Sequence, residues 1–123
     1  MPKISEVLSE AYTMGDKIKL YIPSTYQGEN PGDPEVINKT ILDVIGKFSA
    51  WFGGSTCYNA RGGYLAHNGD IIQESIVIVE SFGDPGAIEA HAGDILTLAK
   101  GIKLAMLQES IAIEHNNRMY IIE

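Results

Sequence analysis

The order in which strand-forming and helix-forming segments follow one another restricts the fold of this chain more than any other feature. Ile18, Leu20 and Ile22 alternate with more polar neighbours over residues 17–24, which predicts a half-buried strand. Apolar side chains with a 3.6-residue period predict a helix over residues 34–52. The remaining predicted elements are strands over residues 55–66, 71–82, 110–114 and 118–122 and a second long helix over residues 87–108.

Capping and turn residues between these segments support the predicted boundaries of the helices and strands. Asp33 is expected to cap the first long helix, with Pro34 in its first turn, and the pair Gly53-Gly54 is expected to end it. The Asn-Gly pair within residues 67–70 predicts a hairpin turn. Residues 26–34 are dense in Gly, Pro, Asn and Asp, so we predict a loop there.

The resulting order is β-α-β-β-α-β with an appended C-terminal strand, which is the ferredoxin-like split βαβ pattern of the α+β class. Right-handed crossovers place both helices on one face of an antiparallel sheet. The unbroken apolar run over residues 76–79 indicates a strand inside that sheet or at an interface. The other sheet face then needs a cover, and we predict that self-association into a homodimer or larger oligomer provides it.

Length and charge exclude several classes of protein. The chain has 123 residues, which predicts one domain over residues 1–123, with residues 1–15 forming a short helix or an arm that pairs with another subunit. The net charge is −7 and the few basic residues are scattered, so nucleic-acid binding is not expected. A single cysteine, Cys57, and the lack of a long apolar segment predict a cytoplasmic protein without a membrane span.

One glycine-rich segment, residues 52–70, is the strongest candidate for a binding site. It contains an arginine fork suited to carboxylate or phosphate, tyrosines that can stack on a ring, and paired glycines that permit close approach or positive φ. The candidate ligand-binding residues are Thr56, Tyr58, Asn59, Arg61, Gly62, Gly63 and Tyr64. The functional interpretation is a pocket for a small anionic or nucleotide-like ligand. The structural alternative is a bulged, twisted hairpin whose glycines serve the bend.

Three functions remain open. The first is a non-catalytic oligomeric binding protein, for example a sequestering protein of phage or mobile-element origin. The second is a small enzyme in which Glu74, with His67, works as acid and base, and Glu74 could also pair with Arg61 across the hairpin. The third is a protein-interaction module that uses the open sheet face or the loop over residues 27–33. No metal-ligand spacing or cofactor motif is present, so neither a metal nor a cofactor is expected.

The sequence also contains an internal echo. Residues 73–76 read Gln-Glu-Ser-Ile, and the same four residues recur over residues 108–111. In both places alternating apolar residues and then a glutamate follow. The echo fits the pseudo-twofold relation of the two split βαβ halves, and chance is the competing explanation for so short a match.

A set of residues resembles a family of small uncharacterised bacterial and phage proteins over about residues 17–122. The set comprises the strand KLYIPS, the helix end Phe52-Gly53-Gly54, and Thr56, Ala60, Gly63, Gly69 and Glu74. The resemblance implies a ferredoxin-like fold and supplies no activity. Arg61 and the N-terminal extension have no place in the family's pattern.

Overall fold

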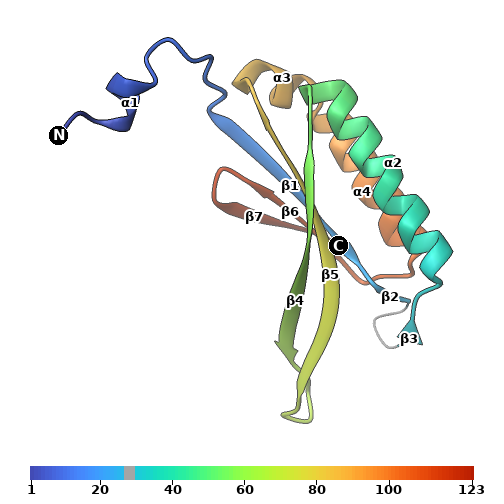
Figure 1. Ribbon diagram of the computed structural model, residues 1–123. Helices are drawn as coiled ribbons and strands as arrows, with labels where there is room; N and C mark the ends of the chain where they lie inside the picture. The colour runs from blue at the N-terminus through green and yellow to red at the C-terminus, as the bar shows by residue number, and fades with distance from the viewer. Residues whose placement is uncertain (27–29) are drawn as a thin grey trace.

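The computed structural model describes residues 1–26 and 30–123, and its main feature is an antiparallel five-stranded sheet with helices on one face (Figure 1). The strand order is β4-β5-β1-β6-β7. The strands are β1 (Asp16–Pro23), β4 (Thr56–Leu65), β5 (Ile71–Gly83), β6 (Ile111–His115) and β7 (Arg118–Ile122). The helices are α1 (Ile4–Val7), α2 (Pro34–Phe52), α3 (Pro85–Ala90) and α4 (Ala92–Ala105). The predicted ferredoxin-like α+β class is confirmed.

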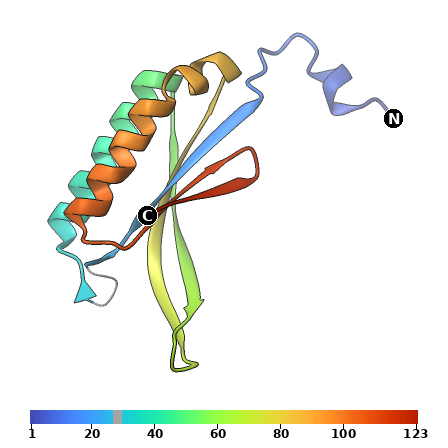
Figure 2. The same ribbon diagram turned by 180° about the vertical axis from the view of Figure 1, so that it is seen from behind.

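Strand β1 divides the sheet into two different faces. Ile18, Leu20 and Ile22 are buried beneath the helices, and Leu20 is completely inaccessible. The alternate residues Lys19 and Tyr21 point to the opposite face, which no helix of the described chain covers (Figures 1 and 2). We call this second surface the open face. That another subunit covers the open face stays a prediction.

Helix α2 begins and ends where the sequence predicts. The Asp33 carboxylate accepts a 2.9 Å hydrogen bond from the backbone N–H of Glu35, which satisfies one of the unpaired donors at the helix start. Gly53 has φ = 96°, and this left-handed conformation ends the helix at low steric cost.

The predicted helix over residues 87–108 is wrong in one respect, because it is two helices, α3 and α4, separated at His91. The His91 ring stacks on Trp51 of α2 with 5.0 Å between ring centroids and an interplanar angle of 18°. Its Nδ1 lies 2.9 Å from the Asp94 carboxylate. These contacts hold the backbone of His91 away from helical geometry, at φ = −102° and ψ = 10°. They depend on tertiary packing, so helical periodicity alone does not reveal the break.

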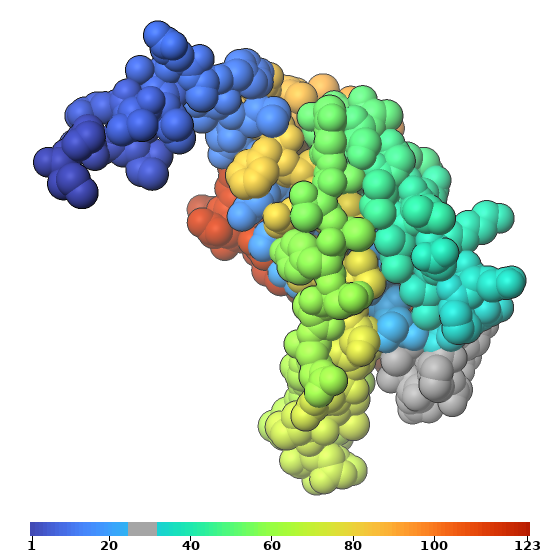
Figure 3. All heavy atoms as spheres, viewed as in Figure 1, coloured from blue at the N-terminus to red at the C-terminus, as the bar shows by residue number. Residues whose placement is uncertain are grey.

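The hairpin formed by β4 and β5 is regular, and the alternative of a bulged hairpin is wrong. The register runs without a break from Thr56 opposite Glu80 to Leu65 opposite Ile71. Its turn is a three-residue loop closed by a 2.8 Å hydrogen bond between Ala66 and Asp70, with Gly69 at φ = 91°. The far end of this hairpin extends beyond the helix layer (Figures 1 and 3).

The segment predicted as a loop over residues 26–34 contains a short second ladder. Strand β2 (Thr25–Tyr26) pairs antiparallel with β3 (Asn30–Pro31). Residues 27–29 lie outside the described residues. The hypothesis that the loop over residues 27–33 meets a protein partner therefore falls partly outside them. At the other end of the chain, α1 belongs to an extended N-terminal arm, residues 1–15, that leaves the body of the molecule (Figure 3).

No helix among residues 1–26 and 30–123 is long and apolar enough to span a bilayer. The apolar core lies instead between the sheet and the helices, where the largest fully buried side chains include Phe48, Leu20 and Val79.

Leu20→Ala should lower the free energy of unfolding by about 2–5 kcal/mol, because it leaves a cavity under the helices that the central strand cannot close. Leu104→Ala makes the same chemical change at a side chain that is 72% exposed, so its effect should stay within about 0.5 kcal/mol. Urea unfolding followed by circular dichroism measures both values. Equal losses for the two variants would contradict the assignment of the core.

Candidate functional site

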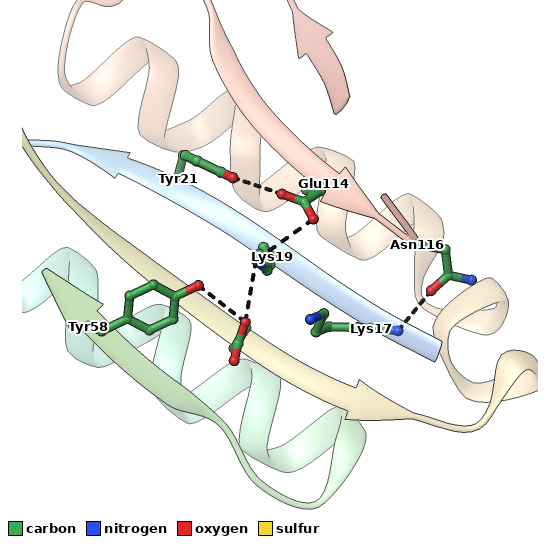
Figure 4. Close-up of polar contacts among 7 residues, drawn as sticks. Lys17, Lys19, Tyr21, Tyr58, Glu114 and Asn116 are labelled. Carbon is green, nitrogen blue, oxygen red and sulfur yellow. Dashed lines mark hydrogen bonds and ion pairs between the residues drawn. The ribbon is translucent and has the colours of Figure 1, made fainter. Parts of the chain in front are cut away.

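A row of polar side chains crosses the open face from β4 to β6 (Figure 4). Lys19 lies between two carboxylates, with its Nζ 3.8 Å from Glu80 and 3.7 Å from Glu114. The Tyr21 hydroxyl donates a 2.8 Å hydrogen bond to Glu114, and the Tyr58 hydroxyl donates a 3.3 Å hydrogen bond to Glu80. We call these five residues the polar row. Its three charged side chains are only 18–19% exposed, although no other element covers them.

The polar row changes the ionisation of two of its members. Burial alone lowers the pKa of Lys19, but its contact with the Tyr58 hydroxyl and the charges of Glu114 and Glu80 outweigh burial, and the pKa is raised. Burial raises the pKa of Tyr21, and its hydrogen bond to the Glu114 carboxylate raises it further. Lys19 therefore stays cationic and Tyr21 stays a neutral hydrogen-bond donor over the physiological range.

A groove of about 220 Å³ adjoins the polar row on the open face and shares Tyr21 with it. The β4–β5 hairpin supplies one wall and the start of β6 supplies the other. Its lining residues are Tyr21, Pro23, Gly62, Gly63, Tyr64, Glu74, Ile76, Gln108, Ser110, Ile111 and Ala112. The groove therefore combines two phenol rings, a carboxylate and an apolar floor, the mixture that binds small polar molecules with a ring.

The strand register separates the seven predicted ligand-binding residues into two groups. Thr56, Tyr58, Gly62 and Tyr64 alternate on the open face, because their partners continue the rows of Lys19 and Tyr21 across the sheet. Asn59, Arg61 and Gly63 are on the opposite side of the ribbon. They do not form a single set of side chains.

The two predicted catalytic candidates are also apart. Glu74 lines the groove and lies opposite Gly62 in the ladder. His67 is in the exposed turn at the tip of the hairpin, outside the groove. Arg61 lies opposite Ser75, so it projects from the face opposite to Glu74, and the register does not support the predicted pairing of Arg61 with Glu74.

Gly62 and Gly63 do not have the positive φ that the sequence suggested, since Gly53 and Gly69 are the glycines with positive φ among the described residues. A Cβ on Gly62 would lie 3.9 Å from Ile76 Cδ1 and 4.0 Å from Glu74 Cγ, which is ordinary contact. A Cβ on Gly63 would meet its nearest neighbour at 3.8 Å. Packing within the chain therefore does not require glycine at either position, and Gly62 leaves open space in the groove.

A hollow of about 820 Å³ lies between α2 and α4. Its charged lining includes Lys47, which pairs with Asp43 one helical turn away at 3.1 Å. This is the usual solvent face of two neighbouring helices, and its lining includes Asp43 and Asp94 but no phenol group. No three His, Cys, Asp or Glu side chains in the described part of the chain are arranged to hold a metal ion.

The sequence analysis did not predict the polar row, since Lys19, Glu80 and Glu114 were not among its candidate residues. A signal for it was present, because Glu80 and Glu114 are the glutamates that close the two copies of the internal echo. Strands β5 and β6 flank β1 and bring these glutamates to either side of Lys19, although they are not equivalent positions of the echo, since Glu80 follows Gln73 by seven residues and Glu114 follows Gln108 by six.

Comparisons with known proteins identify the fold. No family model and no curated protein matches this chain. Among solved structures, it is similar to a phage SAM lyase in complex with S-methyl-5'-thioadenosine, with a TM-score of 0.63, 21% identity, and coverage of 90% of this chain and 91% of the other. A phage SAM lyase in the apo state aligns with a TM-score of 0.62, 19% identity and 88% coverage of both chains. These similarities agree with the predicted fold.

Replacing Glu114 by Gln should lower the pKa of Tyr21, because the phenolate would no longer face a negative charge. In the wild type, the folded state holds the Tyr21 proton more tightly than the unfolded state, whose pKa is about 10. This contribution to stability is complete below pH about 10 and is lost as the pH rises through the folded-state pKa. The ¹³Cζ chemical shift of the Tyr21 ring, which is resolved from those of the other five tyrosines by assignment, measures the titration. Glu109→Gln, at an exposed neighbouring site, should leave it unchanged.

Lys19→Met should lower the free energy of unfolding by about 1–2 kcal/mol, since Glu80 and Glu114 would face each other without a cation at a poorly solvated site. Lys47→Met removes a cation from an ion pair whose side chains are about half exposed, and should cost less than about 0.5 kcal/mol. Chemical denaturation at neutral pH compares the two variants. A Lys19 variant as stable as the Lys47 variant would show that the row is not coupled.

Proposed function

We propose that this chain binds a small nucleoside-like molecule in the open-face groove, of the class that includes S-methyl-5'-thioadenosine and its sulfonium precursor S-adenosylmethionine. The observation that carries the proposal is the groove itself, where Tyr21, Tyr64 and Glu74 meet on a concave surface. The similarity to a phage SAM lyase that holds S-methyl-5'-thioadenosine supports the ligand class.

The charge of the open face favours a neutral or cationic ligand over an anionic one. The groove contains Glu74, and the adjoining polar row has two carboxylates against one ammonium. Arg61, the side chain expected to hold an anion, projects from the other side of the hairpin. A sulfonium nucleoside would therefore meet a favourable potential, whereas a phosphate would meet repulsion.

Each ligand group has a plausible partner in the groove. The phenol rings offer faces on which a purine ring or a sulfonium methyl group can lie. The Glu74 carboxylate can accept hydrogen bonds from ribose hydroxyls or attract a cation. The groove, at about 220 Å³, falls below the roughly 300 Å³ of typical small-molecule pockets, so part of the ligand would stay accessible.

Isothermal titration calorimetry with S-methyl-5'-thioadenosine and S-adenosylmethionine tests the proposal on a matched pair of variants. Gly62→Val fills the groove from its floor and should weaken binding by at least about tenfold. Ser75→Val, by contrast, enlarges an exposed side chain on the other side of the ribbon, outside the groove lining, and should change affinity by less than about threefold. Equal affinities for the two variants, or no binding by the wild type, would overturn the proposal.

A second candidate function is lyase cleavage of the sulfonium nucleoside, which the carboxylate of Glu74 in the groove and the two lyase structures favour. Incubation with S-adenosylmethionine followed by chromatography would detect released S-methyl-5'-thioadenosine. Turnover that disappears in Glu74→Gln would establish the enzyme. Binding without turnover would leave a sequestering protein, the role expected for a phage or mobile-element product.

A further inference from the structure

A second hollow lies on the helix side of the sheet, between helices α3 and α4 and strands β1, β6 and β7. Its volume is about 280 Å³, and its walls include Ile88 and Leu96 from the helices and Tyr120 and Ile122 from β7. Leu96 is 38% exposed and Tyr120 is 48% exposed. We call this hollow the β7 slot. It lies across the sheet from the open-face groove.

The N-terminal arm presents apolar side chains that have no place in the core of their own chain. Ile4, Val7 and Leu8 are 76%, 66% and 54% exposed. Together with Ala11 they follow the i, i+3, i+4, i+7 spacing of an amphipathic helix, of which the structure forms one turn, α1 (Ile4–Val7). An exposed stripe of this kind on an otherwise acidic chain indicates a surface that becomes buried on association.

The root of the arm is fixed, and its stripe is held apart from the slot of the same chain. The Tyr12 hydroxyl donates a hydrogen bond to the Asp84 carboxylate, and Asp16 contacts His115 at 3.2 Å. From these anchors the arm runs outward, away from α4 and β7, in both ribbon views (Figures 1 and 2). A second molecule can receive the stripe without breaking either anchor.

We propose that the N-terminal arm of one copy inserts Ile4, Val7 and Leu8 into the β7 slot of a second copy, and that two exchanged arms hold a homodimer. The chemistry on both sides is apolar, and Lys3 beside the stripe provides a cation for Glu89, which lines the slot. Exchange is reciprocal, so each contact occurs twice around a twofold axis. Two arms and two slots together bury on the order of 1,200 Å², the lower range of stable interfaces.

The oligomeric state of the full chain tests the proposal. Light scattering after size exclusion should show a dimer for the wild type and a monomer for the double variant Val7→Asp, Leu8→Asp. The arm is exposed, so this variant should keep the circular dichroism and unfolding midpoint of the body. Leu104→Asp changes an equally exposed leucine of α4 outside the slot and should remain dimeric. A monomeric wild type, or a double variant that stays dimeric, would overturn the proposal.

Disulfide trapping identifies the occupant of the slot. In a Cys57→Ser background, a chain with Leu8→Cys is mixed with a chain carrying Leu96→Cys and oxidised. We expect a mixed disulfide dimer, and much less product when Leu104→Cys replaces Leu96→Cys. Absence of the mixed dimer, or a bridge that forms only within one chain carrying both cysteines, would show that the slot is empty or holds its own arm. The result is independent of ligand binding in the groove.

Discussion

The one-sided burial of β1 is the constraint on which the other features depend. The strand is paired on both edges, by β5 and β6, so its two faces are the only directions left for side chains. Leu20 and its alternate neighbours are buried under the helices, whereas Lys19 is forced to the other face. A shift of register by one residue would bury the ammonium and expose the leucine, which costs far more than any other local rearrangement.

The polar row follows from this arrangement. The Lys19 ammonium on the central strand is only partly solvated, and it forms ion pairs with Glu80 and Glu114 of the two flanking strands. The Tyr21 hydroxyl then donates to the second oxygen of Glu114, and the Tyr58 hydroxyl donates to the same Glu80 oxygen that Lys19 contacts. The row fixes Tyr21, and Tyr21 is also a wall of the groove, so the electrostatics of the sheet and the shape of the candidate site are connected. The arrangement therefore stabilises the sheet and also orders the candidate binding surface.

Much of the fold could be predicted from the sequence because its signals are local. Alternation and helical period are properties of neighbouring residues, and Asp33 and Gly53 mark the ends of α2 through interactions within one turn. The break at His91 could not be predicted in this way, because the ring stacks on Trp51, forty residues earlier in the chain. The N-terminal arm is held to the body at Tyr12 while its apolar side chains stay exposed, and its pattern indicated a helix or an arm without deciding between them.

The candidate site was predicted less well, for a related reason. The sequence prediction grouped neighbouring residues of β4 into one site. Successive side chains of a strand point to opposite faces, so residues such as Tyr64 and Arg61 are not on the same face. Which face carries the site depends on the pairing partner of each residue, and Gly62 becomes informative only when it is seen opposite Glu74. The internal echo does not give the pairing either, because Glu80 follows Gln73 by seven residues whereas Glu114 follows Gln108 by six.

The open-face groove is the centre of this account, and methyl NMR spectroscopy tests it most directly. Isoleucine methyl groups report on both faces, since Ile76 lines the groove while Ile95 lies in the core and lines the β7 slot. On titration with S-methyl-5'-thioadenosine, the account predicts a saturable shift of the Ile76 resonance with the Ile95 resonance unchanged. Shifts confined to the helix side, or an unperturbed Ile76 at saturating ligand, would contradict the assignment of the groove as the binding site.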